Sequence, residues 1–563
     1  MPTPEATFHD LSRDIVVRFL QTVVVLDDRA TFDADEPNTN KKPIVKVPGR
    51  GSVTSSEDHI SKSSSSSAND PETDARHKLN AKKLIDTFAD QGLICSVLKP
   101  YPDELQERTV LMEKTLKSVS RSDIVILDWQ LDGDAGALTT EIIKRIVAED
   151  KIELHRLRMI AIYTGETGLG DIMAKIKMEL NDPSFKADLP FLLSNGRVRV
   201  VIYAKADLGI ESRFHDRVAS EEDLPEKLVN EFTEMTSGLI PNVALASLAA
   251  LRDNAHRLLL KLNKKLDSAY IAHRCLLDSP EDAEQHILAL VIGEIRSILS
   301  QAHVENNAAL PAILAWLRTQ QPKLPRLHRL FTETKDKPDY SALPATGIED
   351  LSILLRIGCN KNNIKHLPKS IISLVSEPQN KIKSSVFSSS TTQGMDDDCE
   401  LAEITASQTR YTASVPHLEL GQIVENEGVY WICLHPRCDS VRIMDPATRT
   451  FLFLKCETVP ITKKHDYVVR NEANEYIHLK VLLKLHESSL LTFRAHSKRK
   501  KVLPYRRFPS ADTKIRWFFR SCDNVVYRWV TELKAEYAQE LSNRFSSEIA
   551  RVALDKTEWL RRT

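Results

Sequence analysis

The chain has 563 residues, of which 77 are Lys or Arg and 78 are Asp or Glu, so its formal net charge is −1. That balance argues against a protein that coats nucleic acid or anionic membrane through bulk charge, although a local basic patch is compatible with it. Apolar residues make up 42% and charged residues 28%, which is typical of a globular protein. The length corresponds to about three or four domains.

The eight Cys are scattered along the chain, which disfavours a disulfide-stapled secreted fold. The first residues include acids and lack an apolar core of the signal-peptide type. The longest apolar runs, such as residues 243–251, are far shorter than the ~20 residues that a membrane span needs. We therefore expect a cytoplasmic protein without membrane partners.

Two segments lack hydrophobic periodicity and are rich in polar residues, with Ser prominent in both. Such a composition cannot bury enough apolar surface to fold, so we expect both segments to be disordered. Residues 33–76 follow directly after a strand signal and are interpreted as an insertion within a domain. Residues 375–412 separate two regions of different texture and are interpreted as a linker.

The first 240 residues alternate short apolar runs with amphipathic patterns. We expect strands at 22–26, 93–98, 123–127, 159–163 and 198–203, and helices at 78–91, 103–118, 137–148, 170–180 and 224–235. Continuous apolar strands separated by helices are typical of a parallel sheet that is covered on both faces. Residues 1–240 are therefore predicted to form an α/β domain with a five-stranded doubly wound parallel sheet.

The rest of the chain divides into further regions. Residues 241–374 show helical periodicity and predict an all-helical middle. Residues 413–510 contain strand-like apolar runs and predict a β-rich domain. Residues 511–563 are predicted to form closing helices, which makes the C-terminal region α+β.

Polar residues follow the predicted strands of the first domain at the point where each strand ends. Asp27 and Asp28 follow the first strand, Asp128 follows the third, and Thr164 follows the fourth. Lys205 lies two residues past the fifth strand. Because the carboxyl ends of parallel strands share one edge of the sheet, we expect these five side chains to lie close together.

The chemistry of these five residues is coherent. Carboxylates that are brought together repel one another unless a cation joins them, and oxygen ligands suit Mg²⁺. A carboxylate can also act as a nucleophile and take up a phosphoryl group, a reaction that depends on positioning and charge neutralisation. An ammonium and a hydroxyl group supply charge and a hydrogen bond for the phosphoryl oxygens. The structural alternative is that the three Asp are ordinary turn residues.

These residues and their order resemble the receiver domain of two-component response regulators, a family with a flavodoxin-like (βα)5 fold. The resemblance implies that Asp128, in VILDWQLDGD, is the phospho-acceptor. It also implies that Asp27 and Asp28, in VVVLDDR, bind Mg²⁺ together with Asp128 and the backbone carbonyl of Gln130. A receiver that has lost phosphorylation is an intermediate case, and the presence of all five residue types argues against it.

The resemblance also assigns residues on the fourth and fifth strands. Thr164, in IAIYTGE, matches the hydroxyl that reads the phosphoryl state, and Lys205, in IYAKAD, matches the lysine of the family. The sequence departs from the family at two nearby points. Ala206 replaces the usual Pro, and Ile202 occupies the usual place of the switch aromatic, with Tyr203 one residue later. Coupling between phosphorylation and the output face is therefore expected to differ.

Three further signals are weaker. Cys433, His435 and Cys438 lie close together in the sequence, but their spacing is loose, and we favour buried thiols over a zinc site. Six cations fall within residues 498–507, for which we favour a solvated or protein-docking face over phosphate contacts. His256 lacks the acid and Pro that usually follow a phosphotransfer His, and the sequence contains no Walker A lysine loop.

We therefore expect Asp128 to accept a phosphoryl group from a separate sensor histidine kinase in an Mg²⁺-dependent reaction. The chain is predicted to act as a signalling module or phosphate sink without an enzymatic output of its own, and other proteins of the same signalling system are further candidate partners. The alternative is a phosphorylation-controlled effector whose C-terminal region binds nucleic acid or has an unrecognised activity. The insertions at 33–76 and 181–195 resemble those of receiver proteins in bacterial anti-phage two-component systems, which implies a role in antiviral defence.

Overall fold

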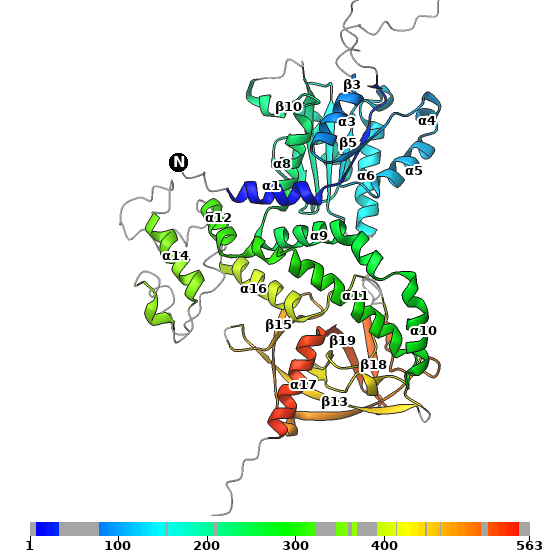
Figure 1. Cartoon of the computed structure of the whole chain (residues 1–563), viewed down its shortest axis with the longest axis vertical. Helices are drawn as coiled ribbons and strands as arrows, with labels where there is room; N and C mark the ends of the chain where they lie inside the picture. Colours follow the sequence, from blue (N-terminus) through cyan, green and yellow to red (C-terminus); the bar gives the residue numbers. More distant parts are fainter. Residues whose placement is uncertain are drawn as a thin grey trace, which may run out of the picture. The chain divides into compact units, whose positions relative to one another are not determined.

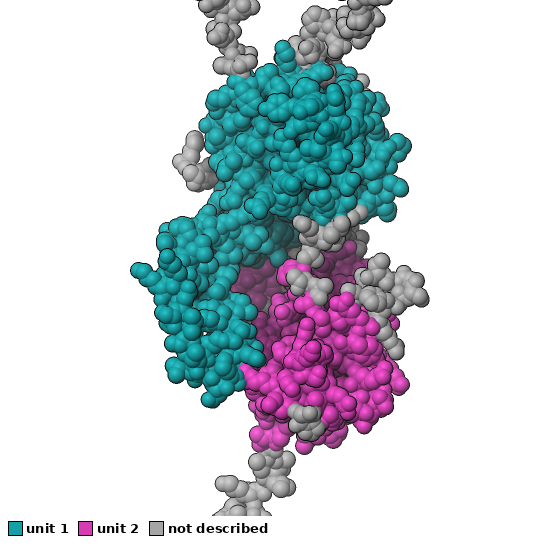
Figure 2. Space-filling model, turned by 90° about the vertical axis from the view of Figure 1, so that its right-hand side faces the viewer, with its two compact units in different colours: residues 1–320 teal, residues 321–563 magenta. Residues whose placement is uncertain are grey.

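The computed structural model describes residues 7–32, 78–152, 156–206, 212–320, 345–358, 363–368, 391–411, 414–444, 447–461, 463–507 and 516–550. The chain forms two compact units, residues 1–320 and 321–563, which are coloured separately in Figure 2. The expected disordered insertion at 33–76 and much of the expected linker lie outside the described residues.

The centre of unit 1 is a parallel sheet (Figure 1). Its strands are β1 (Thr22–Leu26), β4 (Ile94–Leu98), β5 (Ile124–Leu127), β6 (Arg158–Thr164) and β9 (Val198–Lys205). Their order is β4-β1-β5-β6-β9, and each neighbouring pair is parallel. This order, in which the second strand of the five lies outside the first, is that of the flavodoxin-like fold. The predicted doubly wound parallel α/β fold is confirmed.

Three short strands extend this sheet beyond the predicted five. The segment 181–195 contains β7 (Lys186–Leu189) and β8 (Leu192–Ser194), which form an antiparallel hairpin against β9. β10 (Val218–Ala219) pairs in parallel with β9. Strands of two to four residues leave too little alternation in the sequence to be detected, so none of the three was predicted.

A separate pair of short strands lies at the ends of the segment that follows β1. β2 (Ala30–Thr31) and β3 (Leu79–Asn80) pair in parallel, and the Thr31 hydroxyl donates a hydrogen bond to the Leu79 carbonyl at 3.2 Å. The two ends of the long insertion therefore lie side by side, as expected of an insertion within a domain.

Helices cover both faces of the sheet in unit 1. One face packs against α1 (Phe8–Phe19), α3 (Ala81–Asp90) and α8 (Leu224–Thr236), and the other against α5 (Arg108–Val119), α6 (Ala137–Ile152) and α7 (Leu169–Leu180). The strands supply both cores because successive side chains alternate: Val23 and Val25 join the first, Val24 and Leu26 the second.

The helices differ from the prediction at two places. The helix expected at 103–118 is divided at Glu107 into α4 (Pro102–Gln106) and α5. Helix α1, which precedes β1, was not predicted; a reciprocal capping box between Thr7 and Asp10 marks its start. Phe8, Val16 and Phe19 of α1 are buried, so this helix belongs to the core of unit 1.

The helical middle is also confirmed. Within the predicted range 241–374 the described α-helices are α9 (Leu239–Lys261), α10 (Asp267–Leu276), α11 (Asp282–Gln301) and α12 (Leu310–Gln320) in unit 1, and α14 (Ala345–Ile357) in unit 2. Helix α9 packs against α1, and Arg252 donates a hydrogen bond to the carbonyl of Phe19. No single helix in the described ranges is both long enough and apolar enough to cross a membrane; one bent pair, α11 with residues 304–319, passes on length and composition alone.

Unit 2 contains the predicted β-rich region and three described α-helices. The helices are α14 (Ala345–Ile357), α16 (Thr391–Ala406) and α17 (Ala535–Ile549). The strands are β11 (Gln422–Asn426), β12 (Val429–Cys433), β13 (Thr448–Val459), β14 (Tyr467–Arg470), β15 (Tyr476–Val481), β16 (Ser488–Arg494), β17 (Tyr505–Arg507), β18 (Arg516–Arg520) and β19 (Val526–Glu532).

The structure of unit 2 departs from the sequence-based expectation at two segments. Helix α16 lies within residues 375–412, which were interpreted as a linker. Strands β18 and β19 lie within residues 511–563, which were expected to form helices. In β19 only Tyr527 is buried and its neighbours are half-buried, so the strand has little alternation to distinguish it from the helical pattern of α17 that follows.

The sheet of unit 2 closes on itself. Its order is β14-β15-β13-β12-β11-β19-β18-β17, and β16 pairs with β13. An antiparallel bridge between Phe493 of β16 and Ser521 joins β16 to the end of β18. Phe451, Phe453 and Phe519 lie in the enclosed core. Residues of α16 and α17 pack in a second core against the opposite face of β11, β12 and β13, and against β14 and β15. Unit 2 is therefore a small β-barrel flanked by helices.

Two glycines in the turn after β5 provide a test of this packing. Both have a left-handed backbone, with φ +61° at Gly133 and φ +82° at Gly136. A Cβ added to Gly136 would lie 2.2 Å from the indole of Trp129, whereas one added to Gly133 would meet nothing within 4 Å. Gly136→Ala should therefore destabilise unit 1 by about 3 kcal/mol, and Gly133→Ala by about 1 kcal/mol. Urea unfolding measures both, and equal losses would contradict the packing.

Candidate functional site

The carboxyl ends of four neighbouring strands bring polar side chains into a buried cluster. Asp27 follows β1, Asp128 follows β5, and Thr164 and Lys205 are the last residues of β6 and β9. Each of these four residues is at most 4% exposed. Groups this polar are buried together only when they compensate one another, so the edge of the sheet is a functional candidate on physical grounds.

Lys205 joins two of the predicted site residues. Its ammonium Nζ lies 3.0 Å from Oδ2 of Asp27 and 3.4 Å from Oδ1 of Asp128. Burial opposes the charged form of Lys205, but the two carboxylates outweigh it and raise the pKa of this lysine. Lys205 is therefore an ammonium at neutral pH, and it neutralises part of the negative charge that Asp27 and Asp128 bring to the edge.

Asp128 combines a fixed oxygen with an oxygen that has no hydrogen bond. Oδ2 accepts a hydrogen bond from the backbone N–H of Gln130 at 3.0 Å. Oδ1 is buried and has no hydrogen bond, and it lies 3.4 Å from the ammonium of Lys205. Burial raises the pKa of Asp128 to about 6; the carboxylates of Asp27 and Asp28 add to this rise, and Lys205 opposes it.

Asp28 brings a third carboxylate to the same edge. It is half-buried, its Oδ2 accepts a hydrogen bond from the N–H of Asp132 at 3.2 Å, and its Oδ1 is buried without a hydrogen bond. Burial is the main cause that raises the pKa of Asp28, and the charge of Asp27 adds to it. The charge of Arg29 acts in the opposite direction on Asp28. The three carboxylates at this edge outnumber the two cations, Lys205 and Arg29, which leaves an excess of negative charge.

The excess charge and the free oxygens fit a divalent cation. Carboxylate oxygens at Asp28 and Asp128 lack hydrogen bonds, and an all-oxygen donor set suits Mg²⁺. The carbonyl of Gln130 accepts a hydrogen bond from Gly133 at 3.2 Å and retains a second lone pair. In the described part of the chain no group of three or more His, Cys, Asp or Glu side chains is already arranged around a metal position.

Thr164 shares the edge but makes different contacts. Its hydroxyl oxygen accepts a hydrogen bond from the N–H of Glu166 at 3.1 Å, which leaves the hydroxyl proton available to a ligand. A second bond spans the two loops: Nε2 of Gln130 donates to Oε1 of Glu166 at 2.8 Å. This bridge was not predicted, although each residue lies two positions after a predicted site residue, Asp128 or Thr164.

The loop that follows Asp128 is held from two sides. Thr139 of α6 donates a hydrogen bond from its hydroxyl to the carbonyl of Asp128 at 2.7 Å. Oδ1 of Asp134 accepts from the N–H of Ala137 at 3.0 Å, and Arg108 of α5 pairs with Asp134 at 2.9 Å. These supporting residues, which sequence reasoning missed, fix where the strand ends and the helix begins.

Ile202 and Tyr203, the two candidate positions of the switch residue, lie on opposite faces of β9. Ile202 packs in the core with α6 and α7, whereas Tyr203 packs in the core with α8. The Tyr203 hydroxyl donates a hydrogen bond to Glu231 at 3.1 Å, and Arg217 lies 5.4 Å from the centre of its ring. Tyr203 therefore joins the polar network of α8.

The weaker sequence signals occupy separate environments. Cys433 is buried, and burial raises its pKa to about 12, while Cys438 is exposed. The ring of His435 packs against Phe451 with centroids 4.6 Å apart. His256 is exposed on α9.

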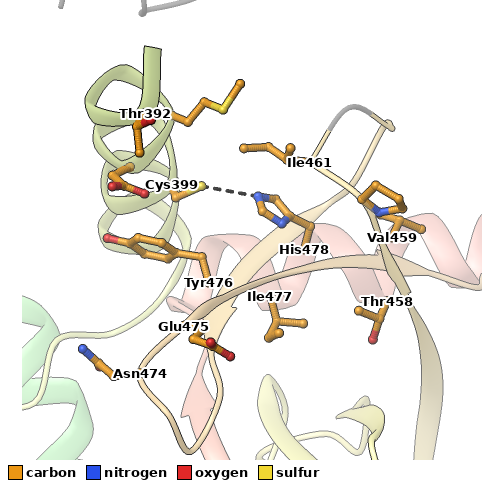
Figure 3. Close-up of a pocket in the computed structure, with 13 residues that line it drawn as sticks. Thr392, Cys399, Thr458, Val459, Ile461, Asn474, Glu475, Tyr476, Ile477 and His478 are labelled. Atoms are coloured by element: carbon orange, nitrogen blue, oxygen red, sulfur yellow. Dashed lines mark hydrogen bonds between the residues drawn. The ribbon is translucent and has the colours of Figure 1, made fainter. Parts of the chain in front are cut away.

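A cavity of about 810 Å³ in unit 2 contains a thiol and an imidazole that sequence reasoning did not connect. Figure 3 shows Cys399 of α16 and His478 of β15 facing each other, with Sγ and Nε2 3.3 Å apart. Burial and the nearby Asp396 raise the pKa of Cys399, and burial with the neighbouring His465 lowers the pKa of His478. Both groups are therefore neutral, which disfavours a thiolate nucleophile here.

The raised pKa of Asp128 has a measurable effect on stability. The ordinary carboxyl pKa of about 3.9 rises to about 6 in the folded state, so the neutral form is stabilised and this stability is lost as pH rises through about 6. Asp128→Asn keeps the neutral form at all pH values. In chelator-treated protein at pH 8, the free energy of unfolding of this variant, measured with urea, should exceed that of the native chain by on the order of 2–3 kcal/mol. Near pH 4 the two free energies should be equal.

The control for this experiment is Asp132→Asn, which removes an exposed carboxylate of the same turn. It should leave the pH dependence of the native chain unchanged. A native chain and Asp128→Asn that unfold at the same urea concentration at both pH values would contradict the buried, charge-crowded position of Asp128.

Comparison with known proteins gives one result for this region. No curated protein and no solved structure matches the chain. The family model described as the response receiver domain matches residues 19–209. This span begins at the last residue of α1, ends four residues past Lys205, and includes the whole acidic edge. Residues 19–209 of this chain are therefore a response receiver domain.

Proposed function

We propose that Asp128 accepts a phosphoryl group from the phosphohistidine of a sensor kinase. A receiver domain implies a histidine kinase or phosphotransfer partner in general. The observation that supports the proposal most directly is the state of Oδ1 of Asp128, a buried carboxylate oxygen without a hydrogen bond that lies 3.4 Å from the ammonium of Lys205. Such an oxygen is a nucleophile with a counter-charge already in place.

The transfer can be written with the residues at this edge. Oδ1 of Asp128 forms a bond to phosphorus while the bond from phosphorus to the histidine nitrogen breaks, and the electron pair returns to the imidazole. A pKa of about 6 leaves most Asp128 ionised at neutral pH, as a nucleophile must be. Lys205 offsets charge on the phosphoryl oxygens, and the Thr164 hydroxyl donates a hydrogen bond to one of them.

Receiver domains generally bind Mg²⁺ at the phosphorylation site. In this chain Asp27, Asp28, Asp128 and the carbonyl of Gln130 would hold the ion. When bound, it neutralises the charge of the phosphoryl oxygens and helps to orient the group. The unpaired oxygen of Asp28 supports this assignment, because Lys205 already serves Asp27 and Asp128.

The output of the chain is proposed to be signalling without an enzymatic step of its own, either through protein partners or as a phosphate sink. We place the reaction in the cytoplasm, in keeping with Cys residues that are scattered and free in the described ranges. A role in antiviral defence stays a prediction from the resemblance of the insertions.

Phosphorylation can be tested with acetyl phosphate and Mg²⁺, followed by intact-mass measurement of the full chain. The native chain should gain the mass of one phosphoryl group, and the addition should be lost in hydroxylamine, which cleaves acyl phosphates. Asp128→Asn should gain nothing, while Asp132→Asn should behave as the native chain. An equal addition to native chain and Asp128→Asn would refute the assignment of Asp128.

Magnesium binding can be tested separately, because Trp129 directly follows Asp128 and is buried beside it. Titration with Mg²⁺ should change the tryptophan fluorescence of the native chain but not of Trp129→Phe. Asp28→Asn should weaken binding at least tenfold, since it removes the carboxylate that Lys205 does not neutralise. Undiminished affinity in Asp28→Asn would exclude this residue as a ligand.

A further inference from the structure

Two arginines, Arg494 and Arg520, are the chain neighbours of the two residues whose bridge closes the barrel of unit 2. Phe493 bridges Ser521 in an antiparallel arrangement, and the N–H of Cys522 donates to the carbonyl of Thr492 at 2.8 Å. The antiparallel register of this bridge, continued by one residue, leads to Arg494 of β16 and Arg520 of β18. Like charges at opposed positions of a sheet repel each other, so an anion bound beside them would be stabilising.

More cations continue from this seam into the turn between β16 and β17. Lys498, Arg499 and Lys500 are exposed, as are Arg494, Arg506 and Arg520. We call these six residues the basic seam. Within the parts of the chain that the structure describes, none of the six forms an ion pair with a carboxylate. Other arginines of unit 2 do so within 4.0 Å: Arg437, Arg470, Arg516, Arg528 and Arg544.

Aromatic rings hold two of these guanidinium groups in place. Arg506 lies 4.9 Å from the ring centre of Trp517, and Arg520 lies 5.4 Å from that of Tyr505. Tyr505 and Phe518, which are partners across β17 and β18, stack with centroids 5.9 Å apart. A guanidinium fixed over a ring offers both charge for a phosphate and a flat surface on which a base can stack.

We propose that the basic seam binds single-stranded nucleic acid. Six cations spread over a hairpin and an adjacent strand exceed what one phosphate needs, and they match a ligand with repeated phosphates. The stacked arginine and aromatic groups match unpaired bases, which a duplex does not offer from its side. An acidic protein would use the charges but not the flat surfaces.

This inference goes beyond the proposed phosphoryl transfer and does not depend on it. The charge involved is local, since the net charge of the chain is −1 and supplies no general attraction to polyanions. It also revises the interpretation of residues 498–507 as a solvated or protein-docking face. The new evidence is the like-charged pair at the seam and the rings beneath the arginines, neither of which the linear sequence displays.

The test uses the full chain and a fluorescent oligothymidylate of about 16 nucleotides, with anisotropy measured over a series of salt concentrations. The native chain should bind with an affinity that falls as salt rises. The triple variant Lys498→Gln/Arg499→Gln/Lys500→Gln should bind at least tenfold more weakly, and its slope of log affinity against log salt should be shallower by about 2. The unphosphorylated protein suffices, so failure here leaves the phosphoryl-transfer proposal intact.

A second variant guards against loss of binding through misfolding. Arg494→Gln/Arg520→Gln removes the like-charged pair, so it should weaken binding while its thermal midpoint stays equal to or above that of the native chain. The matched control is Lys463→Gln/Lys464→Gln, which removes two exposed lysines of unit 2 outside the seam and should leave binding unchanged.

Several outcomes would overturn the proposal. These are salt-independent or absent binding by the native chain, an equal loss in the Lys463/Lys464 control, and tighter binding to a duplex of the same length. Binding to polyglutamate or to phosphatidylserine vesicles that oligothymidylate does not compete away would instead assign the seam to an acidic protein or a membrane surface, and would equally refute the nucleic-acid proposal.

Discussion

The receiver domain depends on the burial of one ammonium group between two carboxylates. Lys205 neutralises Asp27 and Asp128 at the edge of the sheet, and none of the three side chains is more than slightly exposed. Removing the ammonium would leave two buried charges uncompensated, which is far more costly than never having buried them. The same contact therefore also links the ends of β1, β5 and β9, although β9 pairs with β6 and not with the other two.

Much of unit 1 could be predicted from the sequence because its signals are local and agree with one another. Five apolar runs of strand length alternate with amphipathic segments, and the polar residues that end those runs must meet at one edge in any parallel sheet. Asp27, Asp128 and Lys205 were placed together by that rule alone. The directness of the Lys205 contacts and the charge imbalance at Asp28 required coordinates, since a strand order does not give the distance between side chains.

Other features were missed because their causes are distant in the sequence. The bridge from Gln130 to Glu166 joins two loops, and Cys399 meets His478 only through the packing of α16 on the barrel. The prediction of helices over 511–563 was wrong for β18 and β19, because the alternation in a short strand is hard to distinguish beside a strong helical pattern. The closure of the barrel at Phe493 and Ser521 likewise has no local signature. Residues 33–76 and 375–390 lie outside the described ranges, so the interpretation of these segments as disordered stays a prediction.

The parallel pairing of β2 with β3 lies in the chain between the acidic pair that follows β1 and the stretch between residues 31 and 79. Because Ala30 and Thr31 are paired with Leu79 and Asn80, the ends of that stretch are fixed to the domain independently of its length. Doubling the intervening chain would raise the entropy cost of closure by only about 0.6 kcal/mol. The length of this stretch can therefore change at little cost in stability. Asp27 and Asp28, a few residues before the β2–β3 pair, keep their positions when it does.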